Sequence, residues 1–221
     1  MTNQEFSNEF DILFNNIASN QAPGLDEYEK SVFLTDAQES LVLEMITGKN
    51  LTGDSFEKTE ELRRYLTDIT KASNPTQSTK STIKKISDKS TLYECPQDLW
   101  LIVYESAKQK GTSAVEVVPI THDEYARISR NPFRKATDCR VLRLDINGVL
   151  ELISNREIEE YNIRYIKKLS PIILEDLPEG LSIKGNNKQT DCELNPALHE
   201  AILGRAVQLA KASMGLIESG R

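Results

Sequence analysis

The N-terminal part of the chain repeats apolar side chains every three or four positions, which is the spacing of one face of an α-helix. Thr2 and Glu5 have the spacing of a capping box, in which side chains bind the first free backbone N–H groups, so the first helix should begin beside them. The Ala-Pro-Gly run at 22–24 should end it. Its apolar face consists of Phe6, Phe10, Leu13, Phe14 and Ile17.

The next stretch carries two such start signals. Asp26 with Glu29 and Thr35 with Gln38 both have capping-box spacing, so the pattern predicts either two helices or one kinked helix up to residue 47. Gly48 is a suitable end, because glycine readily adopts the left-handed conformation that follows many helices.

Composition changes after a third helix, which is expected over about residues 55–70. Residues 73–91 are rich in Ser, Thr and Lys and include Pro75, a composition typical of a linker or a weakly packed extended arm. This stretch is the best candidate for a domain boundary.

Beyond this stretch the apolar period shortens to that of β-strands. The run 99–106 is apolar on both faces and should lie inside a sheet. Asn147-Gly148 separates the apolar runs 139–146 and 149–153, which predicts a type I′ hairpin because both turn residues need positive φ. Further strands are expected at 91–94 and 114–120, and a short helix near 121–131.

Residues 160–168 alternate between two faces, as in an exposed strand, and Pro171 should limit this strand to a sheet edge or end it. Residues 172–174 follow as a short extended run. One face carries Tyr161, Ile163 and Tyr165, and the other carries Asn162, Arg164, Ile166 and Lys168.

The last predicted element is a helix from Asn195, a good N-cap followed by proline, to about Ser213. Its apolar arc is wider than the stripe of about 100° that one packing face needs. Two interpretations stay open: a central helix covered by its own domain, or a helix with one side against a neighbouring subunit. Its polar strip is limited to Glu200, Gly204, Gln208 and Lys211.

The order of elements predicts an α+β fold with two domains. The N-terminal helices and the C-terminal helix should form one helical domain, from residues 1–72 and 194–221. An antiparallel β-rich domain, residues 73–193, should be inserted between them and should contain the short helix near 121–131.

Composition agrees with a soluble globular protein. The 221 residues are 38% hydrophobic and 28% charged, with no apolar run of membrane-spanning length and no signal-peptide pattern at the start. The net charge of −7 lacks the basic footprint of proteins that grip nucleic acid from outside. Cys95, Cys139 and Cys192 are widely spaced, which disfavours a zinc site or a disulfide scaffold and suits a reducing cytoplasm.

Candidate chemistry is sparse. His122 and His199 both fall in first turns of predicted helices, without a nucleophile motif nearby. Gly180 and Gly185 have Walker-like spacing, but Asn186 stands where a phosphate loop requires lysine. We therefore expect no catalytic, cofactor or metal site. Basic patches that could touch DNA, but lack interleaved aromatic residues, are Lys80, Lys84, Lys85 and Lys89, and Lys167 and Lys168.

Four segments resemble connector (ring) proteins of crAss-like, short-tailed bacteriophages. They are NEFDILFNNIASNQAPGLDEYEKSVFLTDAQE, THDEYARISRNPFRKATDCRVLRLDI, YNIRYIKKLSPIIL and CELNPALHEAILGRAVQLAKAS, in this order, and they span most of the chain. The last is also similar in style to tail adaptors of other short-tailed phages, with an extended arm before an alanine-rich helix.

The resemblance implies a non-enzymatic virion protein at the head–tail junction, made in the host cytoplasm. It implies a ring of identical subunits, expected to be twelve, that binds the portal protein and other tail or connector proteins. Genomic DNA would pass through its lumen without sequence recognition, and an acidic lumen would repel the phosphates. Head-to-tail rings need two different contact faces on each subunit. The residues expected at subunit or partner contacts are Tyr161, Ile163, Tyr165, Ile166, Ile172, Leu203, Val207, Ala210 and Met214.

Two other functions stay open on the residues alone. One is a phage-encoded regulatory module that binds nucleic acid through the basic arm, which would show salt-dependent DNA binding. The other is an enzyme with an unrecognised site.

Overall fold

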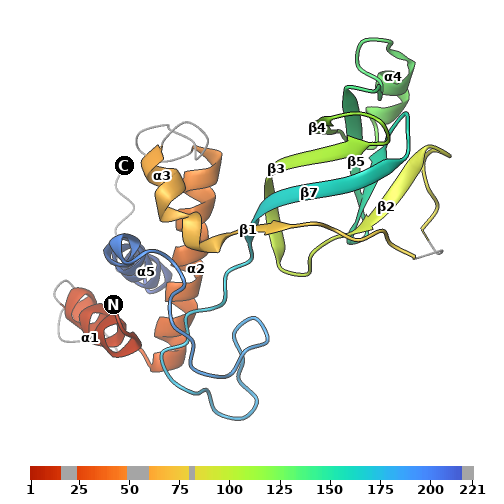
Figure 1. The fold of residues 1–221 in the computed structure, drawn as a ribbon. Coiled ribbons are helices and arrows are strands. Elements are labelled where there is room, and N and C mark those ends of the chain that lie inside the picture. The colour runs from red at the N-terminus through yellow and green to blue at the C-terminus, as the bar shows by residue number, and fades with distance from the viewer. Residues whose placement is uncertain (16–23, 49–59, 80–82, 216–221) are drawn as a thin grey trace. The chain divides into compact units, whose positions relative to one another are not determined.

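The computed structural model describes residues 1–15, 24–48, 60–79 and 83–215 of the chain (Figure 1). It has helices near both ends and a curled sheet between them, so the predicted α+β class is confirmed. Contacts divide the chain into two compact units, a helical unit of residues 1–69 and 169–221 and a β unit of residues 70–168. These divisions differ from the expected boundaries, which placed the β-rich domain at residues 73–193.

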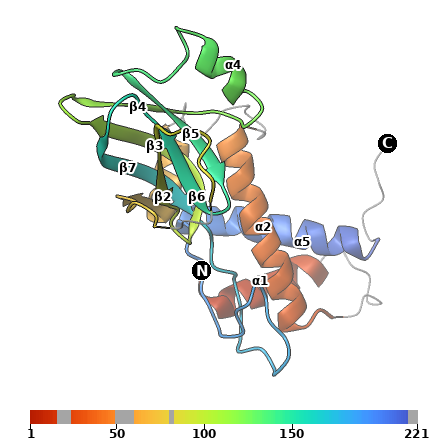
Figure 2. The same cartoon turned by 90° about the vertical axis from the view of Figure 1, so that its right-hand side faces the viewer.

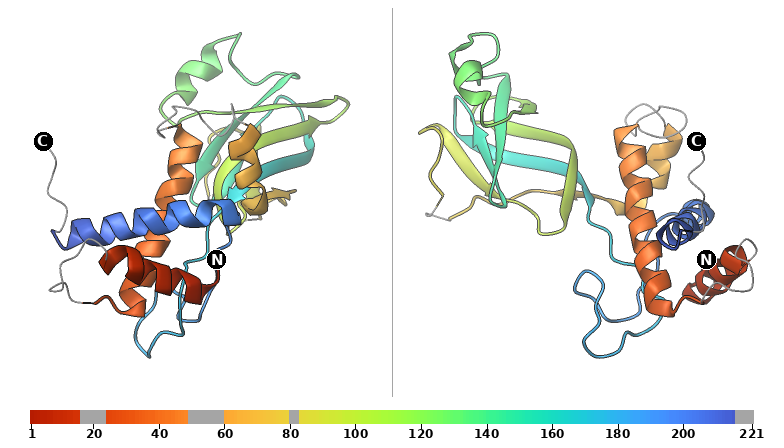
Figure 3. Two further views of the ribbon diagram at one scale, coloured as in Figure 1. Left: turned by 90° about the vertical axis from the view of Figure 1, so that its left-hand side faces the viewer. Right: turned by 180° about the vertical axis from the view of Figure 1, so that it is seen from behind.

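The helical unit is built around three helices, α1 (Asn3–Asn15), α2 (Glu27–Thr47) and α5 (His199–Ser213). Helix α5 lies beside α1 and crosses α2, as Figures 2 and 3 show. The shorter helices of the unit are α3 (Glu60–Tyr65), η1 (Thr67–Ile69) and η2 (Pro196–Leu198). Its core includes Phe6, Phe10, Phe14, Leu34, Val42, Ile202, Ala206 and Ala210. Ile17, assigned to the face of α1 by its spacing, lies outside the described residues, as does the start of the expected third helix.

Helix α2 is one continuous helix, so this stretch does not form two separate helices. The capping box of Asp26 and Glu29 is confirmed, with the Glu29 backbone N–H donating to Asp26 Oδ1 at 2.7 Å and the Asp26 backbone N–H donating to Glu29 Oε2 at 3.1 Å. Gly48 ends the helix with φ of 69°, as expected.

The second capping box was wrong, because Thr35 and Gln38 are buried in the middle of α2 and bind another segment. Thr35 Oγ1 accepts the backbone N–H of Ile172 at 3.1 Å and donates to its carbonyl at 3.3 Å. Gln38 Nε2 donates to the Ser170 carbonyl at 2.7 Å. One turn earlier on the helix, Ser31 Oγ accepts the N–H of Leu174 at 3.0 Å. A polar stripe on α2 therefore binds alternate residues of the extended segment 170–174, while Ile173 between them pairs with Thr190.

Replacing Thr35 by valine should lower the free energy of unfolding by about 1–3 kcal/mol, because it leaves a buried backbone N–H without its acceptor at nearly constant volume. Chemical denaturation would measure this change. Thr47→Val is the matched control on the same helix, since the Thr47 hydroxyl is exposed and bonds only the Leu43 carbonyl among its described contacts. A Thr35→Val variant as stable as this control would contradict the role of the stripe.

Two buried lysines stabilise the helix packing. Lys30 Nζ bonds Asp11 at 2.7 Å and Glu27 at 2.9 Å; burial alone would lower the pKa of Lys30, but these two carboxylates outweigh it and raise the pKa. Lys211, expected on the polar strip of α5, is instead buried and donates to the Leu13 carbonyl at 2.8 Å near the end of α1. A cation is favourable there because helix carbonyls point out of that end. Leu13, assigned to the inner face of α1, is in turn exposed.

The β unit is a seven-stranded curled sheet in the order β1-β7-β3-β4-β5-β6-β2. Strands β4 and β5 pair in parallel and the other pairs are antiparallel, so the expected all-antiparallel sheet was wrong at this pair. A parallel pair needs a crossover, and residues 120–139 with helix α4 supply it. The strands are β1 (Thr70–Ser73), β2 (Ser90–Glu94), β3 (Leu99–Gln109), β4 (Ala114–Pro119), β5 (Arg140–Ile146), β6 (Val149–Ile153) and β7 (Ile158–Lys167), and α4 is Tyr125–Arg130.

The two edges of this sheet meet through the segment that was expected to be a linker or a weakly packed extended arm. After β1 pairs with β7, the Ser78 N–H donates to the Leu92 carbonyl at 2.8 Å, and the Glu94 N–H donates to the Thr76 carbonyl at 2.9 Å. The sheet therefore closes on itself, and strand β7 has partners on both sides over residues 163–166. The expectation of an exposed edge strand was wrong, because β1 covers that edge.

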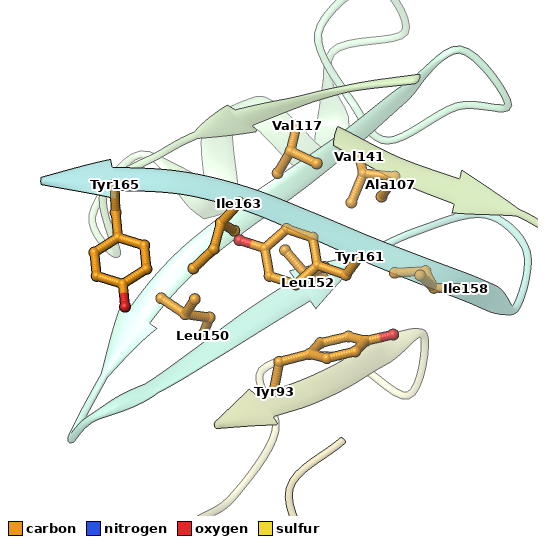
Figure 4. Packing of buried hydrophobic residues seen from close by; sticks show 10 residues of the cluster. All are labelled: Tyr93, Ala107, Val117, Val141, Leu150, Leu152, Ile158, Tyr161, Ile163 and Tyr165. Carbon is orange, nitrogen blue, oxygen red and sulfur yellow. The ribbon is translucent and has the colours of Figure 1, made fainter. Parts of the chain in front are cut away.

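The barrel interior holds the main apolar core of the β unit. Figure 4 shows Tyr161 and Ile163 of β7 facing Leu150 and Leu152 of β6, and the rings of Tyr93 and Tyr161 lie 5.1 Å apart. The hairpin that joins β5 to β6 is confirmed by positive φ at Asn147 (45°) and Gly148 (72°).

Candidate assembly surfaces

The crossover between β4 and β5 holds an aromatic ring out in solvent. Helix α4 packs on β5 and β6 through Ile128, and the turn that follows exposes 86% of Phe133. The Phe133 backbone is held on both sides: its N–H donates to Asn131 Oδ1 at 2.9 Å, and its carbonyl accepts from Arg140 Nη1 at 2.9 Å. The side chain is therefore presented by an ordered turn rather than by a loose loop.

The charges around this ring are mainly basic. Arg130, Arg134 and Lys135 lie within three residues of Phe133 and are all exposed. The Arg134 and Lys135 N–H groups donate to the Asn131 carbonyl at 3.1 and 3.0 Å, which tightens the turn further. We call residues 130–135 the Phe133 turn.

An apolar cleft of about 360 Å³ opens elsewhere on the barrel. Its walls are the start of β3, with Trp100 and Leu101, and the β5–β6 hairpin with Ile146. Leu101 is exposed at its mouth, and Cys95 is half-buried in its wall, where burial raises the pKa of the thiol. We call this hollow the Trp100 cleft.

The Phe133 turn and the Trp100 cleft lie at opposite ends of one strand. The crossover joins β5 at Arg140, and the hairpin that walls the cleft follows its last residue, Ile146. At roughly 3.3 Å per residue, this strand separates the two features by about 20 Å. The two features are thus candidates for the two different faces that a head-to-tail ring needs.

A buried ion pair includes Arg143 of the cleft wall. Glu105 Oε1 accepts from Arg143 Nε at 3.0 Å, and Glu105 Oε2 accepts from the Tyr161 hydroxyl at 2.8 Å. Arg143 also bonds the more exposed Asp145 at 2.5 Å. Burial raises the pKa of Glu105, although Arg143 and Tyr161 act in the opposite direction, and burial also raises the pKa of Tyr161. The network joins β3, β5 and β7 and fixes the wall of the cleft.

The contact residues expected from the sequence lie mostly inside one subunit. Met214 is half-buried and the other eight are buried. The strand face of Tyr161, Ile163 and Tyr165 points into the barrel, where all three side chains belong to the apolar core. The wide arc of α5 is covered within the helical unit. A contact role for these nine residues stays a prediction. Because eight of them are buried within one subunit, exposed side chains next to them would have to make the contact.

Sequence reasoning missed Phe133. Its only signal was an aromatic residue directly after Asn131-Pro132 and before two basic residues, within a segment that otherwise reads as polar. No periodicity marks such a residue, so neither a helix nor a strand pattern could have assigned it to a surface.

Among the contacts of the described residues, neither histidine is hydrogen-bonded to a nucleophilic side chain. His199 is buried, its Nε2 donates to the Leu194 carbonyl at 3.0 Å, and burial lowers its pKa. His122 Nε2 lies 2.9 Å from the Asp145 carbonyl. Within the described ranges, no three His, Cys, Asp or Glu side chains gather as a metal site would require, and no helix is long and apolar enough to cross a membrane. Of the basic patches, Lys84, Lys85, Lys89 and Lys168 are exposed and Lys167 is half-buried, whereas Lys80 lies outside the described residues.

Charge divides unequally between the two units. Residues 70–168 contain 17 Lys and Arg against 13 Asp and Glu, a net charge of +4. The remaining residues contain 10 Lys and Arg against 21 Asp and Glu, a net charge of −11. The net acidity of the chain therefore belongs to the helical unit, and complementary charges are available for contacts between copies.

A fold of two units with exposed apolar features fits a structural assembly protein. The family model of phage tail ring protein 3/4 matches residues 1–220, and the chain therefore belongs to this family of crAss-like phage ring proteins. Ring protein 3 of Bacteroides phage crAss001 is 48% identical over 220 residues, covering 95% of both chains. Ring protein 4/5 of the same phage is 37% identical over 223 residues, covering 96% of this chain and 93% of the relative. The family resemblance found in the sequence is confirmed.

Proposed function

We propose that this chain forms a ring of identical subunits at the head–tail junction of the virion, bound to portal on one side and to the next tail component on the other. The observation that carries the proposal is the full-length family match, because it spans both units rather than one shared module. Membership of a tail ring family implies an oligomeric structural protein of the phage particle. The portal contact, the copy number of twelve and the DNA-filled lumen go beyond that match.

The layer of the ring is also part of the proposal. Two ring proteins of one phage are related to this chain along nearly its whole length, which supports stacked rings built from related subunits. The identity of 48% to ring protein 3, against 37% to ring protein 4/5, favours the position that ring protein 3 occupies. The net charge of −11 supports a lumen lined by the helical unit, because an acidic wall would repel DNA phosphates.

Light scattering of the purified full chain, alone and mixed with portal, tests the ring. Twelve copies of a 24.9 kDa chain should give a particle of about 300 kDa, either alone or added to the mass of portal. A chain that stays monomeric in both mixtures and is absent from virions would contradict the proposal.

The basic β unit favours one other function, binding of nucleic acid from outside. That function predicts salt-dependent retention of duplex DNA by the full chain, because phosphate contacts release counterions. We expect no retention at low salt, since the whole chain carries −7. Retention at 50 mM salt that is lost at higher salt would favour the regulatory function instead.

A further inference from the structure

We propose that neighbouring copies in the ring make contact by inserting Phe133 of one subunit into the Trp100 cleft of the next. The inference rests on the proposed ring, and it names the residues that hold adjacent subunits together. Each copy carries this turn and this cleft at opposite ends of β5. This is the heterologous arrangement that extends from copy to copy until a ring closes.

The shape of the two features supports this contact. Phe133 is the most exposed large apolar side chain among the described residues, and an ordered turn presents it. A preorganised aromatic side chain loses little conformational freedom on docking, which is why such residues often dominate interfaces. The cleft volume of about 360 Å³ is ample, because an apolar cavity of about 150 Å³ already accepts benzene.

Charge supports the same partner. Arg130, Arg134 and Lys135 surround the ring of Phe133 in sequence, whereas exposed Asp145 lies in the wall of the cleft and exposed Glu94 precedes Cys95. Arg143, the one basic residue in the wall, is already bonded to Glu105 and Asp145. Basic groups around the inserted ring would therefore meet the exposed Asp145 carboxylate in the wall of the cleft. A second copy of this chain supplies both features, so no additional partner is required.

Cross-linking in the assembled ring tests the contact, because the cleft already holds a native thiol, Cys95. The parent variant carries Cys139→Ser and Cys192→Ser, so that Cys95 is its one remaining cysteine. Arg134→Cys in this parent keeps Phe133 in place and puts an exposed thiol beside it, and with a short bis-maleimide it should give a covalent ladder of dimers, trimers and larger species. A ladder is expected because each copy would link to one neighbour through its turn and to the other through its cleft.

Two controls make the result specific. Adding Cys95→Ser should abolish the ladder, and placing the new thiol at Ile86, another exposed apolar residue of the β unit, should give none. Dimers alone, a ladder that survives Cys95→Ser, or no cross-links in rings of full mass would overturn the contact while leaving the ring itself intact. Failure of the unmodified chain to form rings alone or with portal would overturn the proposed function as well.

Assembly strength gives an independent readout. Phe133→Ala should weaken ring assembly roughly thirtyfold or more, the effect of removing a hot-spot aromatic, while thermal unfolding of the subunit stays unchanged. Ile86→Ala is the matched control and should assemble normally. Rings of Phe133→Ala that are as stable to dilution as the unmodified rings would overturn the inference.

Discussion

Replacing Leu203 by glutamate should unfold the helical unit rather than merely open the ring. Leu203 is 2% exposed on α5, within the packing of the three main helices. An unpaired carboxylate at such a site costs several kcal/mol, whether it stays ionised or takes up a proton. That is a large part of the roughly 5–15 kcal/mol by which most domains are stable. Val207→Glu, one turn further along, should have the same effect.

Thermal unfolding followed by circular dichroism, together with light scattering, separates the two interpretations of α5. Loss of the cooperative helical transition is the expected result for Leu203→Glu. Gln208→Glu adds the same charge on the exposed side of the same helix and should change the free energy of unfolding by less than about 0.5 kcal/mol. A Leu203→Glu chain that folds normally but no longer forms rings would show that this face of α5 meets a neighbour.

The sequence predicted most elements because their signals are local. The capping box at Asp26, the stop at Gly48 and the hairpin at Asn147-Gly148 each depend on residues within a few positions of one another. Thr35 and Gln38 have the same local signal, but their partners lie more than 130 positions away in the chain. A capping-box pattern therefore cannot distinguish a helix start from a buried stripe that binds a distant segment.

The proposed contact surface was harder to find from the sequence, for a physical reason. Apolar periodicity reports that a face is buried, and it does not report whether the same chain or another copy buries it. The strand face of Tyr161, Ile163 and Tyr165 and the arc of α5 are both covered within their own units. Phe133 has no periodicity to report, so only the folded turn distinguishes it from the polar residues around it.

Replacing Arg143 by methionine should destabilise the β unit by about 3–5 kcal/mol at neutral pH, because it leaves the Glu105 carboxylate buried with only the Tyr161 hydroxyl among its described partners. The side chains of Glu105 and Arg143 are only 7% and 10% exposed, so water cannot replace the lost partner. Asp145 also loses a partner, but at 67% exposure its charge stays solvated. The cleft wall would loosen with the network, so ring assembly should weaken together with stability.

The pH dependence of this loss identifies its cause. The pKa of Glu105 is already raised in the folded chain, mainly by burial, and removal of Arg143 should raise it further. A carboxyl group whose pKa is raised by folding contributes stability at pH values below its pKa in the unfolded chain. This contribution is lost as pH rises through the pKa of the same group in the folded chain. The difference between Arg143→Met and the unmodified chain should therefore be small near pH 4, increase as pH rises and then level off.

Chemical denaturation at several pH values, with the double variant Arg143→Met/Glu105→Gln, completes the test. The second substitution removes the buried charge and keeps an acceptor for the Tyr161 hydroxyl. It should recover most of the stability lost at neutral pH and should remove the pH dependence, because an amide does not titrate in this range. A loss that is equal at all pH values, and that the double variant does not relieve, would mean that Arg143 acts through packing alone.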